Sequence, residues 1–126
     1  MDSKGLFLGL DHIGIKAYDV EKSIKFYTEV LGFELLQRIK PGDVELVFLR
    51  LGEMVVELVE VNDDHKYSDG VVNHLSIKVS DIFAAVEHLR EQQVEFISQG
   101  PTSVGEGRYN FFFRGPAQEK LELFQA

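Results

Sequence analysis

Two histidines and two glutamates of this chain have the types and the spacing that could bind one metal ion. His12 lies in Leu-Asp-His-Ile-Gly-Ile-Lys and His74 in Val-Asn-His-Leu-Ser-Ile-Lys, 62 residues later (74 − 12). Glu57 and Glu122 also lie in matching stretches, Val-Glu-Leu-Val and Leu-Glu-Leu-Phe. A carboxylate within an apolar strand is costly to bury unless it is paired, hydrogen-bonded or bound to a metal. We therefore predict that residues of these four positions form a metal site, and the sequence leaves open whether each site forms within one chain or across two.

The ligand types indicate which ions and which chemistry such a site could support. Two imidazoles and two carboxylates suit Zn²⁺, Ni²⁺, Co²⁺, Mn²⁺ or Fe²⁺, and the absence of sulfur disfavours copper(I). Four ligands on a six-coordinate ion leave two positions for water or for two adjacent substrate oxygens. Such an ion can polarise a carbonyl and stabilise an enediolate. A carboxylate beside it can move a proton between neighbouring carbons.

The elements that must position these residues occur twice in the order strand-helix-strand-strand-strand. We predict one domain over residues 1–126, in which a first module (9–61) and a second module (72–125) are joined by a polar linker (62–71). The predicted strands are residues 9–17, 33–39, 45–51, 54–61, 72–79, 95–98, 109–114 and 120–125, and the predicted helices are 20–31 and 82–92.

The local pattern gives the expected orientation of the ligands. Alternation over residues 9–17 places His12 and Lys16 on one strand face, and Asp19 and Asp81 are expected to cap the two helices. If the modules form one curved sheet, all four ligands can lie on its concave face. The glycine-rich residues 99–108 are predicted to be a mobile loop beside the site.

Composition excludes several other classes of function. The chain has 126 residues, 44% of them hydrophobic, no cysteine, and a net charge of −8. A protein this acidic has no general attraction for nucleic acid or for anionic membranes, and no apolar run approaches the roughly 20 residues of a membrane span. Disulfides and thiolate ligands are absent, and no secretory signal is recognisable. We expect a cytoplasmic protein that acts on small molecules.

Two stretches of the first module resemble a known family. Asp-His-Ile-Gly-Ile, from Asp11 to Ile15, and Ser-Ile-Lys-Phe-Tyr-Thr-Glu-Val-Leu-Gly-Phe, from Ser23 to Phe33, are similar to the opening of the vicinal oxygen chelate superfamily. Its members include glyoxalase I, extradiol dioxygenases, methylmalonyl-CoA epimerase, and fosfomycin and bleomycin resistance proteins. The resemblance implies an α+β fold in which two βαβββ modules form a curved mixed-sheet cup with helices on the outer face. It also implies a homodimer with sites at or near the subunit interface.

The order of the ligands favours one branch of that superfamily. His, Glu, His, Glu is the glyoxalase I pattern, and it falls here on His12, Glu57, His74 and Glu122. The resemblance implies a metal-dependent lyase (lactoylglutathione lyase-like) with one Ni or Zn ion per site, or Co, Mn or Fe. It would convert the hemithioacetal of methylglyoxal and a thiol into a 2-hydroxyacyl thioester through a metal-bound enediolate. Glu122 would be the catalytic base, with Glu57 as the second catalytic carboxylate.

Two departures from the family pattern leave the substrate open. Glutathione-using glyoxalases have Arg where this chain has Lys16, and their Asn after the first metal glutamate is displaced here by one position, to Asn62. A thiol different from glutathione therefore fits the sequence as well. So does a methylmalonyl-CoA epimerase-like enzyme, or a non-catalytic small-molecule-binding or resistance protein of the same fold.

Three further features are expected near the substrate. Lys16 and Arg108 are candidates for contacting an anionic part of the substrate. The run Phe111-Phe112-Phe113 is expected to supply the core on one face of its strand and a pocket wall on the opposite face.

Overall fold

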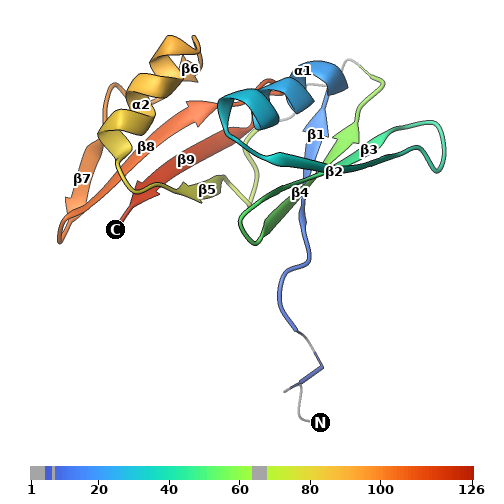
Figure 1. Cartoon of the computed structure of the whole chain (residues 1–126), viewed down its shortest axis with the longest axis horizontal. Helices are drawn as coiled ribbons and strands as arrows, with labels where there is room; N and C mark the ends of the chain where they lie inside the picture. The colour runs from blue at the N-terminus through green and yellow to red at the C-terminus, as the bar shows by residue number, and fades with distance from the viewer. Residues whose placement is uncertain (1–4, 7, 64–67) are drawn as a thin grey trace.

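Two modules of the predicted kind lie side by side in the computed structural model, which describes residues 5–6, 8–63 and 68–126 (Figure 1). Residues 64–67 of the predicted linker lie outside the described residues. The first module contains β1 (Ile13–Ala17), α1 (Val20–Lys25), the π-helix η1 (Phe26–Val30), β2 (Glu34–Ile39), β3 (Leu46–Leu51) and β4 (Met54–Glu60). The second contains β5 (Leu75–Lys78), α2 (Ile82–Glu91), β6 (Glu95–Phe96), β7 (Thr102–Gly105), β8 (Arg108–Arg114) and β9 (Lys120–Gln125).

Each module forms its own mixed sheet. The strand order is β1-β4-β3-β2 in the first and β5-β9-β8-β6 in the second, where β7 also pairs with β8. In both, the first strand runs parallel to the last, and the remaining pairs are antiparallel. The α+β fold with paired modules is therefore confirmed, but as two sheets rather than one continuous sheet. In the described part of the chain, β1 and β5 each keep one edge without a paired strand.

The helices cover the same side of the molecule (Figure 1) and start where the sequence predicts. Asp19 accepts a hydrogen bond from the Lys22 amide at 3.1 Å, and Asp81 accepts one from the Ala84 amide at 3.1 Å. These caps satisfy amides that have no partner within the helix. Gly32, with φ of +81°, ends the first helical segment in a conformation that favours glycine.

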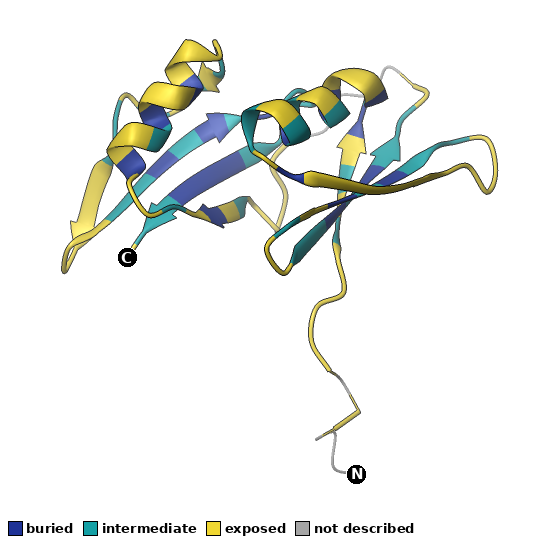
Figure 2. Ribbon diagram, viewed as in Figure 1, coloured by how far each residue is buried: buried dark blue, intermediate teal, exposed yellow. Residues whose placement is uncertain are grey.

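The core lies between the helices and the sheets, where buried segments follow the strands (Figure 2). Buried apolar residues of both modules belong to one cluster. Phe111 and Phe113 are fully buried, whereas Phe112 lies on the opposite, partly open face, as predicted for this aromatic run. No helix in the described ranges is long and apolar enough to cross a membrane.

Two predicted elements show the clearest differences from the structure. The pattern of residues 99–108 predicts a mobile loop, but Thr102–Gly105 forms β7 against β8. The first strand begins at Ile13 rather than at residue 9, and residues 8–12 extend away from the body (Figure 1). Leu8 and Leu10 there are 93% and 90% exposed. Alternation alone does not make a strand, because a strand also needs a neighbour to which its backbone can hydrogen-bond.

Candidate metal centre

His12 and Glu57 form the first half of the candidate centre, here called half-site 1. Gly14 of β1 lies opposite Glu57 of β4, so that His12, two residues earlier, projects from the same face. His12 Nε2 lies 3.4 Å from Glu57 Oε1, and His12 Nδ1 lies 2.8 Å from Asp11 Oδ2. A Cβ atom at residue 14 would lie 3.8 Å from the same Glu57 oxygen, so the glycine leaves open space beside the pair.

His74 and Glu122 form half-site 2 with almost the same geometry. His74 Nε2 lies 3.3 Å from Glu122 Oε1, and His74 Nδ1 lies 3.0 Å from Asn73 Oδ1. The second oxygen of Glu122 accepts a hydrogen bond from Asn110 Nδ2 at 3.1 Å. Glu122 is only 7% exposed, and this burial of a carboxylate requires the partners that surround it.

An aromatic ring contacts each imidazole from the strand on the far side of the glutamate's strand, β3 in the first sheet and β8 in the second. His12 meets Phe48 edge-on, with ring centroids 5.7 Å apart, and His74 meets Phe112 in the same way at 5.2 Å. Phe48 lies opposite Glu57, and Phe112 lies opposite Glu122. The duplication therefore repeats a histidine, its hydrogen-bond acceptor, a glutamate and a phenylalanine.

The hydrogen bonds around His74 orient its ring. The Asn73 side-chain oxygen can only accept, so His74 Nδ1 carries the proton, and Nε2 presents a lone pair when the ring is neutral. The Asp11 hydrogen bond, with a smaller contribution from the Glu57 charge, raises the pKa of His12. In each half-site a nitrogen and a carboxylate oxygen face each other, which favours a cation between them.

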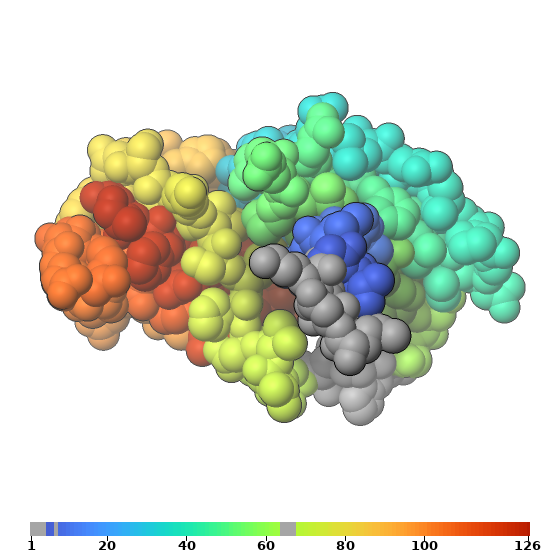
Figure 3. Space-filling model, turned by 90° about the horizontal axis from the view of Figure 1, so that it is seen from below, coloured from blue at the N-terminus to red at the C-terminus, as the bar shows by residue number. Residues whose placement is uncertain are grey.

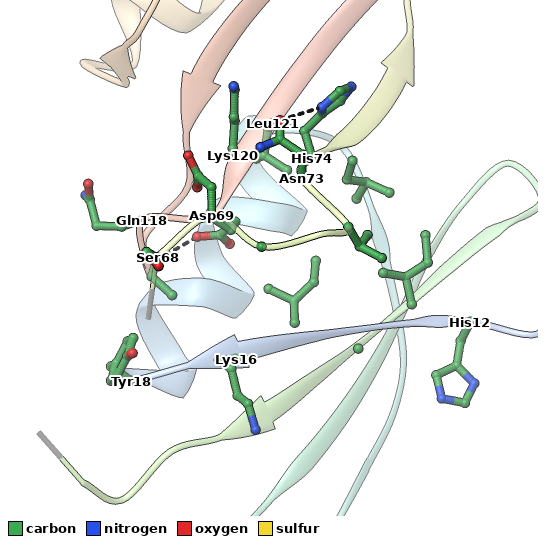
Figure 4. A pocket seen from close by; sticks show the side chains of 18 of the residues that line it. His12, Lys16, Tyr18, Ser68, Asp69, Asn73, His74, Gln118, Lys120 and Leu121 are labelled. Atoms are coloured by element: carbon green, nitrogen blue, oxygen red, sulfur yellow. Dashed lines mark hydrogen bonds between the residues drawn. The ribbon is translucent and has the colours of Figure 1, made fainter. Parts of the chain in front are cut away.

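The two half-sites do not meet within one chain, so the four predicted ligands do not form one cup in a single chain. Among the described residues, no group of three or more His, Cys, Asp or Glu side chains is close enough to hold a metal ion. The rings of His12 and His74 point in different directions (Figure 4). The reason is that the ligands lie on two separate sheets rather than on one concave face.

A cavity of about 630 Å³ lies between the first strands of the two modules. Apolar residues of β1 and β5 line it together with His12 and His74, whereas Glu57 and Glu122 do not, and Lys16 reaches it from β1 (Figure 4). Figure 3 shows the molecule from below, the side toward which residues 8–12 project. Arg108 lies instead at the start of β8, where it bonds Gly105 O at 3.3 Å and Glu106 at 3.1 Å. It does not line the cavity.

Three residues that support the half-sites are not identified by the sequence pattern alone. Asp11 and Asn73 bind the histidine Nδ1 atoms, and Asn110 binds Glu122. A sequence signal exists for the first two, since both repeats place a side-chain acceptor directly before the histidine. No comparable signal marks Asn110, which reaches Glu122 across a strand pair.

This chain is similar in sequence and in fold to several known proteins. The sequence model of the Glyoxalase/Bleomycin resistance protein/Dioxygenase superfamily matches residues 9–123. The uncharacterized protein YwbC of Bacillus subtilis is 34% identical over 92% of this chain and 96% of its own length. A lactoylglutathione lyase of Neisseria meningitidis is 30% identical over 90% of this chain and 88% of its own length. A glyoxalase family protein of Enterococcus faecalis has a similar structure, with a TM-score of 0.76, 26% identity, and coverage of 94% of this chain and 98% of that one.

Proposed function

Because this chain belongs to the Glyoxalase/Bleomycin resistance protein/Dioxygenase superfamily, we propose that it is a metal-dependent lyase of the glyoxalase I kind. Its reaction would convert the hemithioacetal of a 2-oxoaldehyde, such as methylglyoxal, and a thiol into a 2-hydroxyacyl thioester. The observation that carries the proposal is the repeated His–Glu pair, with nitrogen-to-oxygen distances of 3.4 and 3.3 Å.

The geometry of each pair fits a divalent ion. Ligands about 2.1 Å from a zinc ion, at tetrahedral angles, lie about 3.4 Å apart. Each Nδ1 atom has its own acceptor, so both Nε2 atoms are directed at the glutamates. The donor set of nitrogen and oxygen favours Ni or Zn, with Co, Mn or Fe as alternatives. One such pair leaves at least half of the coordination positions of an ion unfilled.

A second copy of this chain would complete the ligand set. In the proposed homodimer, half-site 1 of one subunit faces half-site 2 of its partner, which gives two equivalent sites. The open edges of β1 and β5 support this assembly, because an unpaired edge is a template for another strand. So do the exposed apolar side chains beside those edges, namely Leu8, Leu10, Val71 and Val72.

The reaction needs a proton to move between adjacent carbons of the substrate. The bound ion would polarise the substrate oxygens and so acidify the carbon–hydrogen bond. Glu122 is the proposed base: it takes the proton from the carbon that bears sulfur and returns it to the former carbonyl carbon. Asn110 holds one oxygen of this carboxylate and leaves the second directed toward His74. Lys16, at the cavity, is proposed to contact an anionic part of the thiol.

Elemental analysis and an activity assay test the proposal together. We expect about one divalent ion per chain. We also expect protein that has been reloaded with a divalent metal to isomerise methylglyoxal hemithioacetals when a panel of thiols is supplied. Epimerisation of a 2-methylacyl thioester by the same preparation, without lyase activity, would favour the epimerase instead. A protein that binds no divalent ion under these conditions would contradict the proposed metal-dependent reaction.

A further inference from the structure

The π-helix η1 makes directional contacts with the second module. Among the described residues, the helices and strands that contact each other extensively always lie in the same module. Two hydrogen bonds cross from η1 to the second module. The Tyr27 hydroxyl donates to Glu119 Oε2 at 2.8 Å, and His88 Nε2 donates to the Val30 carbonyl at 2.8 Å. Apolar contact also joins the modules, but it is not directional and does not by itself set an angle between them.

Glu119 is held from two sides in the turn between β8 and β9. Its Oε1 accepts the Ala117 amide at 2.8 Å, while its Oε2 accepts the Tyr27 hydroxyl. Tyr27 is fully buried, and burial raises the pKa of Glu119. A carboxylate in such surroundings costs free energy unless it is hydrogen-bonded, so the tyrosine hydroxyl and the amide oppose that cost.

Gly115 makes room for this carboxylate. A Cβ atom at residue 115 would overlap the carboxyl group of Glu119. The same turn is closed by Gly115 N–H donating to Glu119 O at 2.9 Å and by Gln118 N–H donating to Gly115 O at 3.0 Å. The turn is thus shaped around the Glu119 side chain, which ties it to the first module.

The duplication does not account for this pair. In the repeat, Leu89 takes the place of Tyr27, 62 residues later, and Met54 takes the place of Glu119, 65 residues earlier. Both counterparts are apolar. Most of the counterpart of η1 in the second module lies in the regular α2 helix, whereas η1 is a π-helix. π-Helical turns are uncommon and often occur where a protein has a specific task.

We propose that Tyr27 and Glu119 are positioning residues that set the orientation of the second module relative to the first. If the proposed function holds, the same pair determines whether half-site 1 and half-site 2 of two subunits can meet in one symmetric dimer. The orientation itself does not depend on metal or on activity, so it can be measured in metal-free protein.

A distance between spin labels on the two modules tests the proposal. The chain has no cysteine, so Gln37→Cys on β2 and Ala84→Cys on α2 give two unique labelling positions, both exposed. Labelled chains are mixed with an excess of unlabelled chains, so that distances within one subunit dominate. We expect one narrow distance distribution, which shifts or broadens in the Tyr27→Phe, Gly115→Ala and Glu119→Leu variants.

Two controls separate positioning from general loss of stability. Glu119→Gln can still accept from the Ala117 amide and donate to the Tyr27 oxygen, so it should keep the narrow distribution. Val86→Ala removes buried volume from α2 within the second module, and it should lower stability without changing the distribution. A distribution unchanged in Tyr27→Phe and Glu119→Leu, or changed equally in Val86→Ala, would overturn the proposal. Absence of metal or lyase activity would leave this result unaffected.

Discussion

His74 Nε2 lies 3.3 Å from Glu122 Oε1, although the two residues are far apart in the sequence. The parallel pairing of β5 with β9 brings them together, as the pairing of β1 with β4 does for His12 and Glu57. Each chain thus carries two copies of a histidine–glutamate pair, and each pair supplies half of the proposed ligand set.

Mixing two inactive variants should restore activity if the sites are shared between subunits. Glu57→Gln damages half-site 1, and Glu122→Gln damages half-site 2, so each homodimer should lose metal retention and turnover. In a mixed dimer both substitutions fall in one site, and the second site is intact. Random exchange should therefore restore about a quarter of wild-type activity per chain. Activity that stays at background after verified subunit exchange would contradict a shared site.

Removing the acceptor beside His74 should weaken metal binding. Asn73→Leu leaves Nδ1 without its partner at 3.0 Å, so the ring loses its preferred orientation and tautomer. We expect the metal affinity to fall by about tenfold or more, measured by competition with a chelator. Asn73→Asp restores an acceptor like Asp11 in half-site 1, and its affinity should stay close to that of the wild type. Equal loss in both variants would count against this role of the acceptor.

A charge on the exposed segment before β1 should prevent dimer formation. Leu10 is 90% exposed in the single chain, and in the proposed dimer the partner covers it. Leu10→Asp should give monomers in sedimentation experiments and should reduce the metal content. Val104→Asp, on β7 at the far edge of the second sheet, is the control and should leave the dimer intact. If Leu10→Asp remains dimeric, the interface must lie elsewhere.

The contribution of Glu119 to stability should depend on pH. Burial raises its pKa above the ordinary value of 4.5, so the folded state binds a proton more tightly than the unfolded state does. This group therefore stabilises the fold below pH 4.5, and the stabilisation is lost as pH rises through the raised pKa. Glu119→Gln does not titrate. The free energy of unfolding of wild type minus that of Glu119→Gln should fall over this range, measured by urea denaturation of metal-free protein. A difference independent of pH would contradict the burial of this carboxylate.

Much of the fold follows from local sequence pattern. Alternation and helical spacing predict most elements, and Asp19 and Asp81 mark the helix starts because a side-chain acceptor is needed there. The π-helical turn at Phe26–Val30 does not follow from the sequence, because apolar spacing is compatible with a regular helix as well. The strand β7 cannot be recognised from the sequence either. Its side chains are all exposed, so it has no apolar alternation, and its glycine and polar residues are typical of a loop.

The sequence by itself determined the duplicated module and the candidate ligand pairs, because these depend on residue type and on pairing within one repeat. Only the tertiary structure decided that the pairs stay apart within one chain. The relative orientation of the two modules depends on contacts between residues far apart in the sequence, such as Tyr27 with Glu119. Such contacts produce no periodic pattern in the sequence. The candidate ligands could therefore be identified from the sequence, whereas their division into two half-sites could not.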